Sequence, residues 1–532
     1  MGTQDPPTTG PQTATEEGLK LTRRTALALL GVGSIGAAMT GSSAADHGDG
    51  SDEVRPWNQN VNANDHDLFD LHSIDVEHVF TAARDADVIV WKDEAGTFHA
   101  DSRDGHVESG EGVMEVTQAA VDSLTEGRTT KEKVLVVSSG TVSNEPDERK
   151  TIELPSHTVL DVPATIDVEY EPGEHSNDVV VRAQNVENIE IPRLNVRGGP
   201  WMAIRVLSCS NVKLGHIDVR FAADSNANDA IRIDDRAAAG RTTDVQLNSA
   251  YIENGTQHSV ETYGVDRVQI GQVLVDGVEG CAVILNDTRD ATVNSVIGHN
   301  PESTTRYATF RCANGCRNVS VGQVVSRDAP RGIHITTDSN DVTIGEVNIV
   351  GARNRGIAVD GVENVTIQGG LVKNVDEEGF ISYGDCISVS NLRIVDDRPA
   401  NERTQTHAIQ FTGTNGRIVN NDVRDGGTED LIHVDSPTTV VSGNVGDGVA
   451  SGTTTLESSA DPAARIEGVA DHHAATLELR ASAATDSAAA FAWDHYFEYT
   501  GQEWELVIEW RTDPGEDLEL DYIVDQPQAN IS

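Results

Sequence analysis

The stretch Asn340-Asp-Val-Thr-Ile-Gly-Glu-Val347 is one copy of a motif that recurs through the middle of the chain. Each copy carries alternating Val, Ile or Leu residues, usually after an Asn, and a Gly often follows them. Other copies lie at residues 185–191, 210–217, 266–273, 317–324 and 364–371. With weaker copies included, the first apolar residues of successive copies run from Ile189 to Val440 in steps of 22 to 33 residues. A repeat of this length, made of short alternating runs, predicts a stacked solenoid.

A second short strand is expected between successive copies, as in Ala230-Ile-Arg-Ile233, Ala282-Val-Ile-Leu285 and Gly332-Ile-His-Ile335. Each coil then has at least two strands, with Gly, Asn or Asp at the turns. Helical heptads and the regular Leu spacing of leucine-rich repeats are both missing. We therefore expect an all-β fold, a right-handed parallel β-helix of about ten coils stacked roughly 4.8 Å apart.

Other elements are expected on both sides of the repeat. Residues 115–127 predict a short amphipathic helix that ends at Gly127. Alternating runs at 475–480, 496–499, 504–510 and 518–524 predict a small C-terminal β module, which could cap the last coil or bind a glycan through Trp493, Trp504 or Trp510. The expected domains are a signal peptide (1–45), an N-terminal lead and cap region (46–114), the β-helix (115–450) and the C-terminal module (451–532).

The composition is strongly acidic. Asp and Glu outnumber Lys and Arg by 86 to 39, which gives a formal net charge of −47. Such a surface is typical of halophilic proteins that work in molar salt, where repulsion is screened within about 3 Å. A nucleic acid is not expected as a partner, because no basic stripe is present to offset phosphate charge.

The N-terminal residues predict export. Arg23 and Arg24 precede an apolar run at 26–39, and the small residues at 43–45 follow it. The run is too short and too rich in Gly for a convincing membrane span. Paired arginines favour the twin-arginine route. We expect a secreted protein without a membrane or lipid anchor, whose mature chain starts near Asp46.

Five cysteines are an odd number for an exported protein. Cys312 and Cys316 flank a turn that contains Gly, and they could form a disulfide. Cys209, Cys281 and Cys386 are expected to fill coil interiors as small apolar residues.

The order of elements at the start of the repeat resembles a known family. The helix at 118–124, the strand at 133–142 and the segment 151–166 resemble the start of pectin-lyase-like β-helix proteins, in which a helix caps the open end of the solenoid. The resemblance covers residues 115–445 as architecture. That superfamily contains polysaccharide lyases, polygalacturonase-type hydrolases, epimerases, esterases and phage tailspikes. The resemblance therefore implies an extended glycan as partner more than any one reaction.

Strand alternation predicts a chemically reactive outer face. In Ala230–Ile233 the Ile residues face the interior, so Arg232 faces outward. We carried this register through the following coils. The expected catalytic residues are Asp229, Arg232, Asp234, His258, Glu261, Tyr263 and His334, and the expected substrate-binding residues are Asn286, Phe310, Arg311, Arg331 and Asp360. Arg232 beside Glu261 could equally be a structural salt bridge, and Asp229 and His258 could simply stabilise turns.

Two mechanisms fit these residue types. In β-elimination on a uronic-acid polymer, arginines or a Ca²⁺ held by Asp229, Asp234 or Glu261 would neutralise the sugar carboxylate, and a His or Tyr would act as base or acid. In glycoside hydrolysis, the same three carboxylates could supply the acid and the base or nucleophile. Ca²⁺ is the one cofactor considered, and no metal ligand set is assigned.

Residues 228–231, Asn-Asp-Ala-Ile, resemble a polygalacturonase motif with one residue missing. The paired-Asp and His-Gly elements of that family are not kept, since Gln257-His258 and Gly280-Cys281 stand in their places. We therefore favour a lyase that acts on an extracellular, uronic-acid-containing polysaccharide. A glycoside hydrolase and a non-catalytic glycan-binding or surface protein remain alternatives, and a uniform Thr and Asn face would favour the latter.

Overall fold

The computed structural model describes residues 86–143, 150–176, 179–235, 240–300, 307–446, 449–458, 463–467, 476–481, 493–499, 504–511, 515 and 517–525. The predicted signal peptide and most of the predicted N-terminal lead lie outside the described residues. No helix among the described residues is long and apolar enough to cross a membrane.

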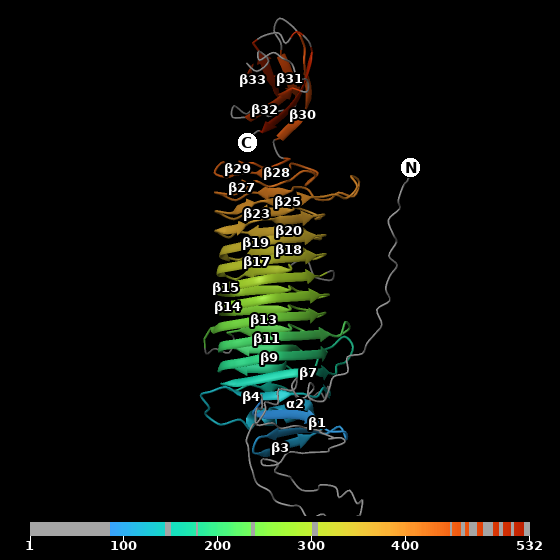
Figure 1. Cartoon of the computed structure of the whole chain (residues 1–532), viewed down its shortest axis with the longest axis vertical. Helices are drawn as coiled ribbons and strands as arrows, with labels where there is room; N and C mark the ends of the chain where they lie inside the picture. The colour runs from blue at the N-terminus through green and yellow to red at the C-terminus, as the bar shows by residue number, and fades with distance from the viewer. Residues whose placement is uncertain are drawn as a thin grey trace, which may run out of the picture. The chain divides into compact units, whose positions relative to one another are not determined.

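The predicted parallel β-helix is confirmed, with about 13 turns rather than ten. Figure 1 shows its strands stacked in register from β4 to β29. The coils are built from β4 (Glu132–Val136), β5 (Gly140–Val142), β6 (Ile152–Glu153), β7 (Thr158–Val168), β8 (Val179–Gln184), β9 (Glu187–Gly198), β10 (Met202–Leu207), β11 (Ser210–Phe221), β12 (Ile231–Asp234), β13 (Thr242–Glu253), β14 (Val260–Asp276), β15 (Val283–His299), β16 (Phe310–Ala313), β17 (Arg317–Arg327), β18 (Arg331–Thr336), β19 (Asn340–Val350), β20 (Arg355–Asp360), β21 (Val365–Ile367), β22 (Gly370–Lys373), β23 (Phe380–Ser382), β24 (Ser388–Ser390), β25 (Leu392–Val395), β26 (Ile409–Phe411), β27 (Arg417–Val419), β28 (Ile432–Val434) and β29 (Val440–Ser442). The additional coils come from β4 to β8, which pair in parallel but do not carry the motif.

The motif works because its turn residue has a left-handed backbone. Asn188, Asn211, Asn318 and Asn364 have φ between 53° and 60°. Asn tolerates this conformation better than most residues. Its side chain also links neighbouring coils, as in the bond from Asn364 Nδ2 to Asp341 Oδ1 (3.1 Å). The Val and Ile residues that follow point into the core and the residues between them point to the surface, so that one continuous apolar core results.

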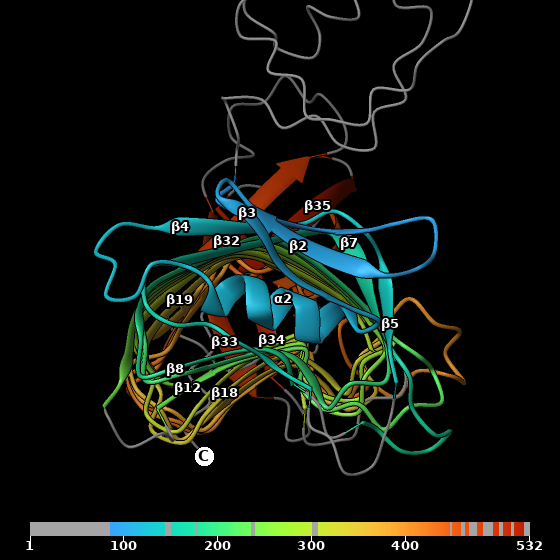
Figure 2. The ribbon, with the colours of Figure 1, turned by 90° about the horizontal axis from the view of Figure 1, so that it is seen from below.

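The N-terminal end of the core is covered by three strands and one helix. These are β1 (Val88–Lys92), β2 (Phe98–Ser102), β3 (Gly105–Gly110) and α2 (Val113–Asp122). Figure 2, which looks along the stack, shows α2 lying across the outline of the coils. Val116, Ala120 and Leu124 are buried in the core. The helix ends at Asp122 rather than at Gly127. Ser123 is its C-terminal cap, and the Ser123 N–H still bonds to Ala119 O.

The predicted C-terminal strands are also present, as two three-stranded antiparallel sheets. They comprise β30 (Val449–Leu456), β31 (Ala463–Glu467), β32 (Thr476–Ala481), β33 (Trp493–Tyr499), β34 (Trp504–Trp510) and β35 (Leu518–Asp525). These sheets have a small core of their own. Trp510 belongs to that core and is only 7% exposed, so it is not available as the stacking platform that the sequence suggested.

The cysteines are all free thiols. Cys312 and Cys316, the predicted disulfide candidates, are buried free thiols, and Cys316 Sγ lies within hydrogen-bond distance of the carbonyl oxygens of Leu285 (3.1 Å) and Ala313 (3.3 Å). Cys209 and Cys281 are buried as expected. Cys386 is exposed, which corrects the expectation that it fills a coil interior.

Candidate functional site

One ladder of outward-facing positions runs through the predicted site. Parallel pairing aligns in turn Arg205, Arg232, Glu261, Ile284, Arg311, His334 and Ala358. Successive members lie one coil, about 4.8 Å, apart. Phe310 was expected to face outward, but it is fully buried in the core and Arg311 occupies the ladder instead. The sequence register was therefore one residue out in β16, because an Arg between two apolar residues must point to the surface.

Arg232 is the centre of a buried ion cluster. Its guanidinium lies 2.9 Å from Asp229 Oδ2, 2.9 Å from Asp234 Oδ2 and 2.6 Å from Glu261 Oε2. Burial alone would lower the pKa of Arg232, but these carboxylates outweigh burial and raise the pKa above its usual value. The structural salt bridge considered from the sequence is thus present, and it engages three carboxylates rather than one.

The three carboxylates do not form an oxygen-lined cage for Ca²⁺. Each directs an oxygen at the Arg232 guanidinium, and Asp229 Oδ1 also accepts the backbone N–H of His258 (2.9 Å). Among the described residues, no group of three or more His, Cys, Asp or Glu side chains could hold a metal ion. We derive no step through a metal.

Glu261 is further tied to the next coil. Asn286 Nδ2 donates to Glu261 Oε1 at 3.0 Å, and Asn286 Oδ1 accepts from Asn314 Nδ2 at 2.9 Å. Tyr263 follows Glu261 by two residues in β14, where it pairs with Asp234 on one side and with Asn286 on the other. These residues extend the ion cluster along the stack.

His258 lies in the turn before β14 and is held as a neutral imidazole. Its Nδ1 accepts the backbone N–H of Cys281 at 2.9 Å, so the proton of the neutral ring is on Nε2. Burial lowers the pKa of His258 to about 4, and Arg311 and Arg232 act in the same direction, while Asp229 opposes them. Gly280 makes this contact possible, because a Cβ there would lie 2.7 Å from His258 Nδ1. With one nitrogen occupied and the other protonated, His258 is suited to donate a hydrogen bond rather than to take a proton.

His334 and Asp360 form a different arrangement. His334 Nε2 lies 2.7 Å from Asp360 Oδ2 on the next coil. Within the described residues, His334 Nδ1 and Asp360 Oδ1 are buried without a hydrogen-bond partner. Buried polar atoms of this kind usually bind a water or a ligand group. Burial lowers the pKa of His334 despite the opposing bond to Asp360, so the ring is neutral near pH 7. Its free base nitrogen is then Nδ1.

Three arginines surround this pair. Arg311 is the ladder neighbour of His334, and Arg331 pairs with Arg355 one coil further on. Burial and the positive charges of Arg355 and Arg311 lower the pKa of Arg331. Arg355 is neutralised in part by Glu378 at 2.8 Å. A group of cations that repel one another favours a bound anion.

Arg355 was not among the residues selected from the sequence. A signal for it existed, because Arg331-Gly332-Ile333 and Arg355-Gly356-Ile357 repeat the same three residue types in successive coils. The predicted site residues therefore separate into two groups along the ladder. The first surrounds Arg232 and the second surrounds His334, with Ile284 between Glu261 and Arg311.

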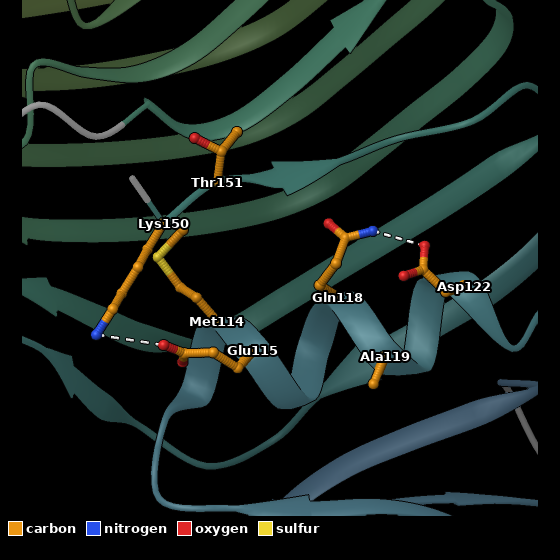
Figure 3. Close-up of a pocket in the computed structure, with 7 residues that line it drawn as sticks. All are labelled: Met114, Glu115, Gln118, Ala119, Asp122, Lys150 and Thr151. Carbon is orange, nitrogen blue, oxygen red and sulfur yellow. Dashed lines mark hydrogen bonds and ion pairs between the residues drawn. The ribbon is translucent and has the colours of Figure 1, made fainter. Parts of the chain in front are cut away.

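Two surface cavities lie away from these groups. One, of about 440 Å³, lies beside α2 and is lined by Met114, Glu115, Gln118, Ala119, Asp122, Lys150 and Thr151 (Figure 3). Its polar side chains pair with each other, Lys150 with Glu115 at 3.2 Å and Gln118 with Asp122 at 2.8 Å. The other, of about 520 Å³, lies over β11 and β13 and includes Tyr251. Neither contains a predicted site residue.

Comparison with solved structures finds parallel β-helix proteins at low similarity. The A-module of the mannuronan C-5 epimerase AlgE4 from Azotobacter vinelandii has a TM-score of 0.40 and 14% identity, covering 62% of this chain and 96% of that one. A mutant tailspike protein of Escherichia coli bacteriophage HK620, in complex with a hexasaccharide, has a TM-score of 0.45 and 11% identity, covering 78% and 89%. No family model and no curated protein sequence matches the chain. These similarities carry no argument about activity.

Proposed function

We propose that this chain is a polysaccharide lyase that cleaves a uronic-acid-containing polymer by β-elimination at the His334 group. The observation that carries the proposal is the His334–Asp360 pair among three arginines, with a buried base nitrogen that has no partner within the described residues. A general base needs its lone pair in the neutral state near working pH, and a lowered pKa meets that need.

The residues of this group divide the chemistry between them. Arg311, Arg331 and Arg355 neutralise the carboxylate of the sugar, which makes the proton on the adjacent carbon more acidic. His334 Nδ1 removes that proton. Asp360 holds the ring through Nε2 and stabilises the imidazolium that forms. The glycosidic C–O bond then breaks, a carbon–carbon double bond forms, and the leaving oxygen takes up a proton.

Hydrolysis is less well supported. A hydrolase of the expected type needs two carboxylates that can act as acid and as base or nucleophile. Asp229, Asp234 and Glu261 instead share the Arg232 guanidinium, where they are held as ion pairs. Glu261, a member of this cluster, lies two coils from Arg311 on the same ladder.

The test is an activity screen in molar salt. The purified full chain is incubated with uronic-acid and neutral polysaccharides, and both the ultraviolet absorbance of an unsaturated uronate and new reducing ends are followed. We expect both signals to rise with one uronic-acid polymer. Reducing ends alone would indicate a hydrolase, and binding without cleavage would indicate a glycan-binding protein.

A matched pair of histidine variants assigns the base. His433 stands four coils beyond His334 on the same ladder, and it also contacts a carboxylate, Asp435 at 3.0 Å. We expect His334→Ala to lower kcat by about 100-fold or more and His433→Ala to leave it unchanged. Equal losses in the two variants would remove His334 from the mechanism.

Export is part of the same proposal. Arg23 and Arg24 would direct the folded chain through the twin-arginine route to the cell exterior, where polymeric glycans are found. Replacing both with Lys should retain the protein inside the cell. Unchanged appearance in the medium would contradict this route.

A further inference from the structure

A second cluster of reactive side chains lies on the strands β1 to β3, which carry none of the ladder residues. On one face of these strands, Val88, Val90, Phe98 and Ala100 are buried in the core. The opposite face carries Trp91, Asp93, His99, Asp101, His106 and Ser109, which are joined by hydrogen bonds and ring stacking.

The contacts around His106 have a defined order. Ser109 Oγ lies 2.9 Å from His106 Nε2, and His106 Nδ1 lies 2.9 Å from Asp101 Oδ1. A hydroxyl, an imidazole and a carboxylate thus follow one another, each within hydrogen-bond distance of the next. This is the arrangement by which a serine nucleophile is activated, with the carboxylate orienting the base.

A β-bulge produces this arrangement. The pairing of β2 with β3 shifts between Ala100 and Asp101, so that Ala100 opposes Glu108 and Asp101 opposes His106. In a regular strand, His106 and Ser109 would point to opposite faces, because they are three residues apart. The bulge brings both side chains to the same face. Bulges are frequent beside active sites, where they redirect one side chain.

The remaining residues of the cluster contact Asp101 and His99. Burial would raise the pKa of Asp101, but hydrogen bonds from Trp91 and His106 outweigh it and lower the pKa below its usual value. His99 contacts the same hydroxyl through Nδ1 (2.8 Å) and Asp93 through Nε2 (3.0 Å). Trp91 stacks on His99 with ring centroids 4.6 Å apart. One serine is therefore flanked by two imidazoles, each held by a carboxylate.

We propose that Ser109, His106 and Asp101 form a serine-nucleophile site that hydrolyses carboxylic esters carried by a polymer. Ser109 and His106 are exposed, and the His106 side chain is 53% accessible. An open surface of this kind suits an acyl group that projects from an extended chain, such as an O-acyl group on a glycan, more than a small free ester that needs an enclosing pocket.

The reaction balances with water as the only co-substrate. Ser109 Oγ attacks the ester carbonyl carbon while His106 Nε2 takes the hydroxyl proton. The C–O bond to the alcohol breaks, His106 returns the proton to the leaving alcohol, and an acyl-serine remains. Water then attacks the acyl group with His106 as base, which releases the carboxylic acid and restores Ser109. His99 Nδ1, 2.8 Å from Ser109 Oγ, helps to position the reacting hydroxyl.

The test uses the full chain in molar salt, with a fluorophosphonate probe and p-nitrophenyl acetate. We expect the probe to label Ser109, as read by peptide mass spectrometry, and the protein to hydrolyse the ester. Ser109→Ala and His106→Ala should each lower the hydrolysis rate by about 100-fold, and Ser109→Ala should abolish the label. His99→Ala should cause a smaller loss, because it removes a group that positions the Ser109 hydroxyl and not the base.

Ser249 provides the matched control. Its hydroxyl also contacts an imidazole, His216 Nδ1 at 2.7 Å, on the strands β11 and β13. Ser249→Ala should leave both the label and the rate unchanged. The proposal is overturned if Ser109 stays unlabelled in the folded protein, or if Ser109→Ala hydrolyses the ester as fast as the parent chain. Circular dichroism confirms folding of each variant. The proposal does not depend on the lyase assay.

Discussion

Asp360 and burial shift the pKa of His334 in opposite directions. Burial lowers the pKa of His334 below 6.5, and the bond to Asp360 limits the fall. Because the base must be neutral, activity should be lost as pH falls through this lowered pKa. Asp360→Asn removes the group that raises it, so the acid limb of kcat/KM should move to still lower pH, while kcat falls about tenfold or more. A pH–rate profile of both proteins checks this, and an acid limb that moves upward would contradict it.

Arg232 should matter for stability more than for binding. Replacing it with Met removes the cation that Asp229, Asp234 and Glu261 share, while Arg205 stays 3.6 Å from Asp234. We expect a loss of about 3–5 kcal/mol in the free energy of unfolding. Arg267→Met is the control, because Arg267 pairs with Asp244 on the exposed surface and should cost less than about 1 kcal/mol. Denaturant melts of both variants decide this, and equal losses would refute the distinction.

The same residues show how far sequence reasoning reaches. Alternation correctly turned Arg232 and Glu261 outward, because Ile and Val fill the coil interior. It failed at Phe310 because the register was carried over from an earlier coil. The local sequence Phe310-Arg311-Cys312, with an Arg between two apolar residues, indicates that Arg311 faces outward. It also did not show that three carboxylates share one guanidinium, since that depends on side-chain conformations and not on spacing.

At the scale of elements, the Asn of the motif holds each turn. Asn364 has φ of 58° and bonds to Asp341 on the neighbouring coil. Asn364→Ala should lower the free energy of unfolding by about 1–2 kcal/mol, from left-handed strain and the lost hydrogen bond. Asn364→Gly also loses the hydrogen bond, but Gly adopts the left-handed backbone without strain. Its loss in the free energy of unfolding should therefore be smaller than that of Asn364→Ala. Melts in which Gly is as damaging as Ala would show that the backbone conformation is not the reason for Asn here.

The motif also explains which elements were predictable. Coils with an Asn turn and alternating Val and Ile were recognised, and their strands occur where expected. Coils formed by β4 to β8 were not counted among the ten because their turns lack the motif, although the segments 133–142 and 151–166 were recognised by resemblance. The β1–β3 cluster escaped notice for a related reason. Its Ser, His and Asp come together through a bulge, and a period of two assigns them to different faces.

At the scale of the whole molecule, the net charge of −47 opposes the binding of an anionic polymer. The Debye length falls from about 10 Å at 0.1 M salt to about 3 Å at 1 M. Long-range repulsion is then screened. The attraction of the partly buried Arg331 and Arg355 for a substrate carboxylate is screened less. We therefore expect KM for a uronic-acid polymer to fall several-fold between these salt concentrations.

A short oligomer of the same uronate, which carries fewer charges, should show a smaller change in KM. Rates measured on both substrates, with circular dichroism to confirm folding throughout, separate screening from a general effect of salt on stability. A KM that rises with salt in the folded protein would mean that surface arginines, not the buried group, dominate substrate binding.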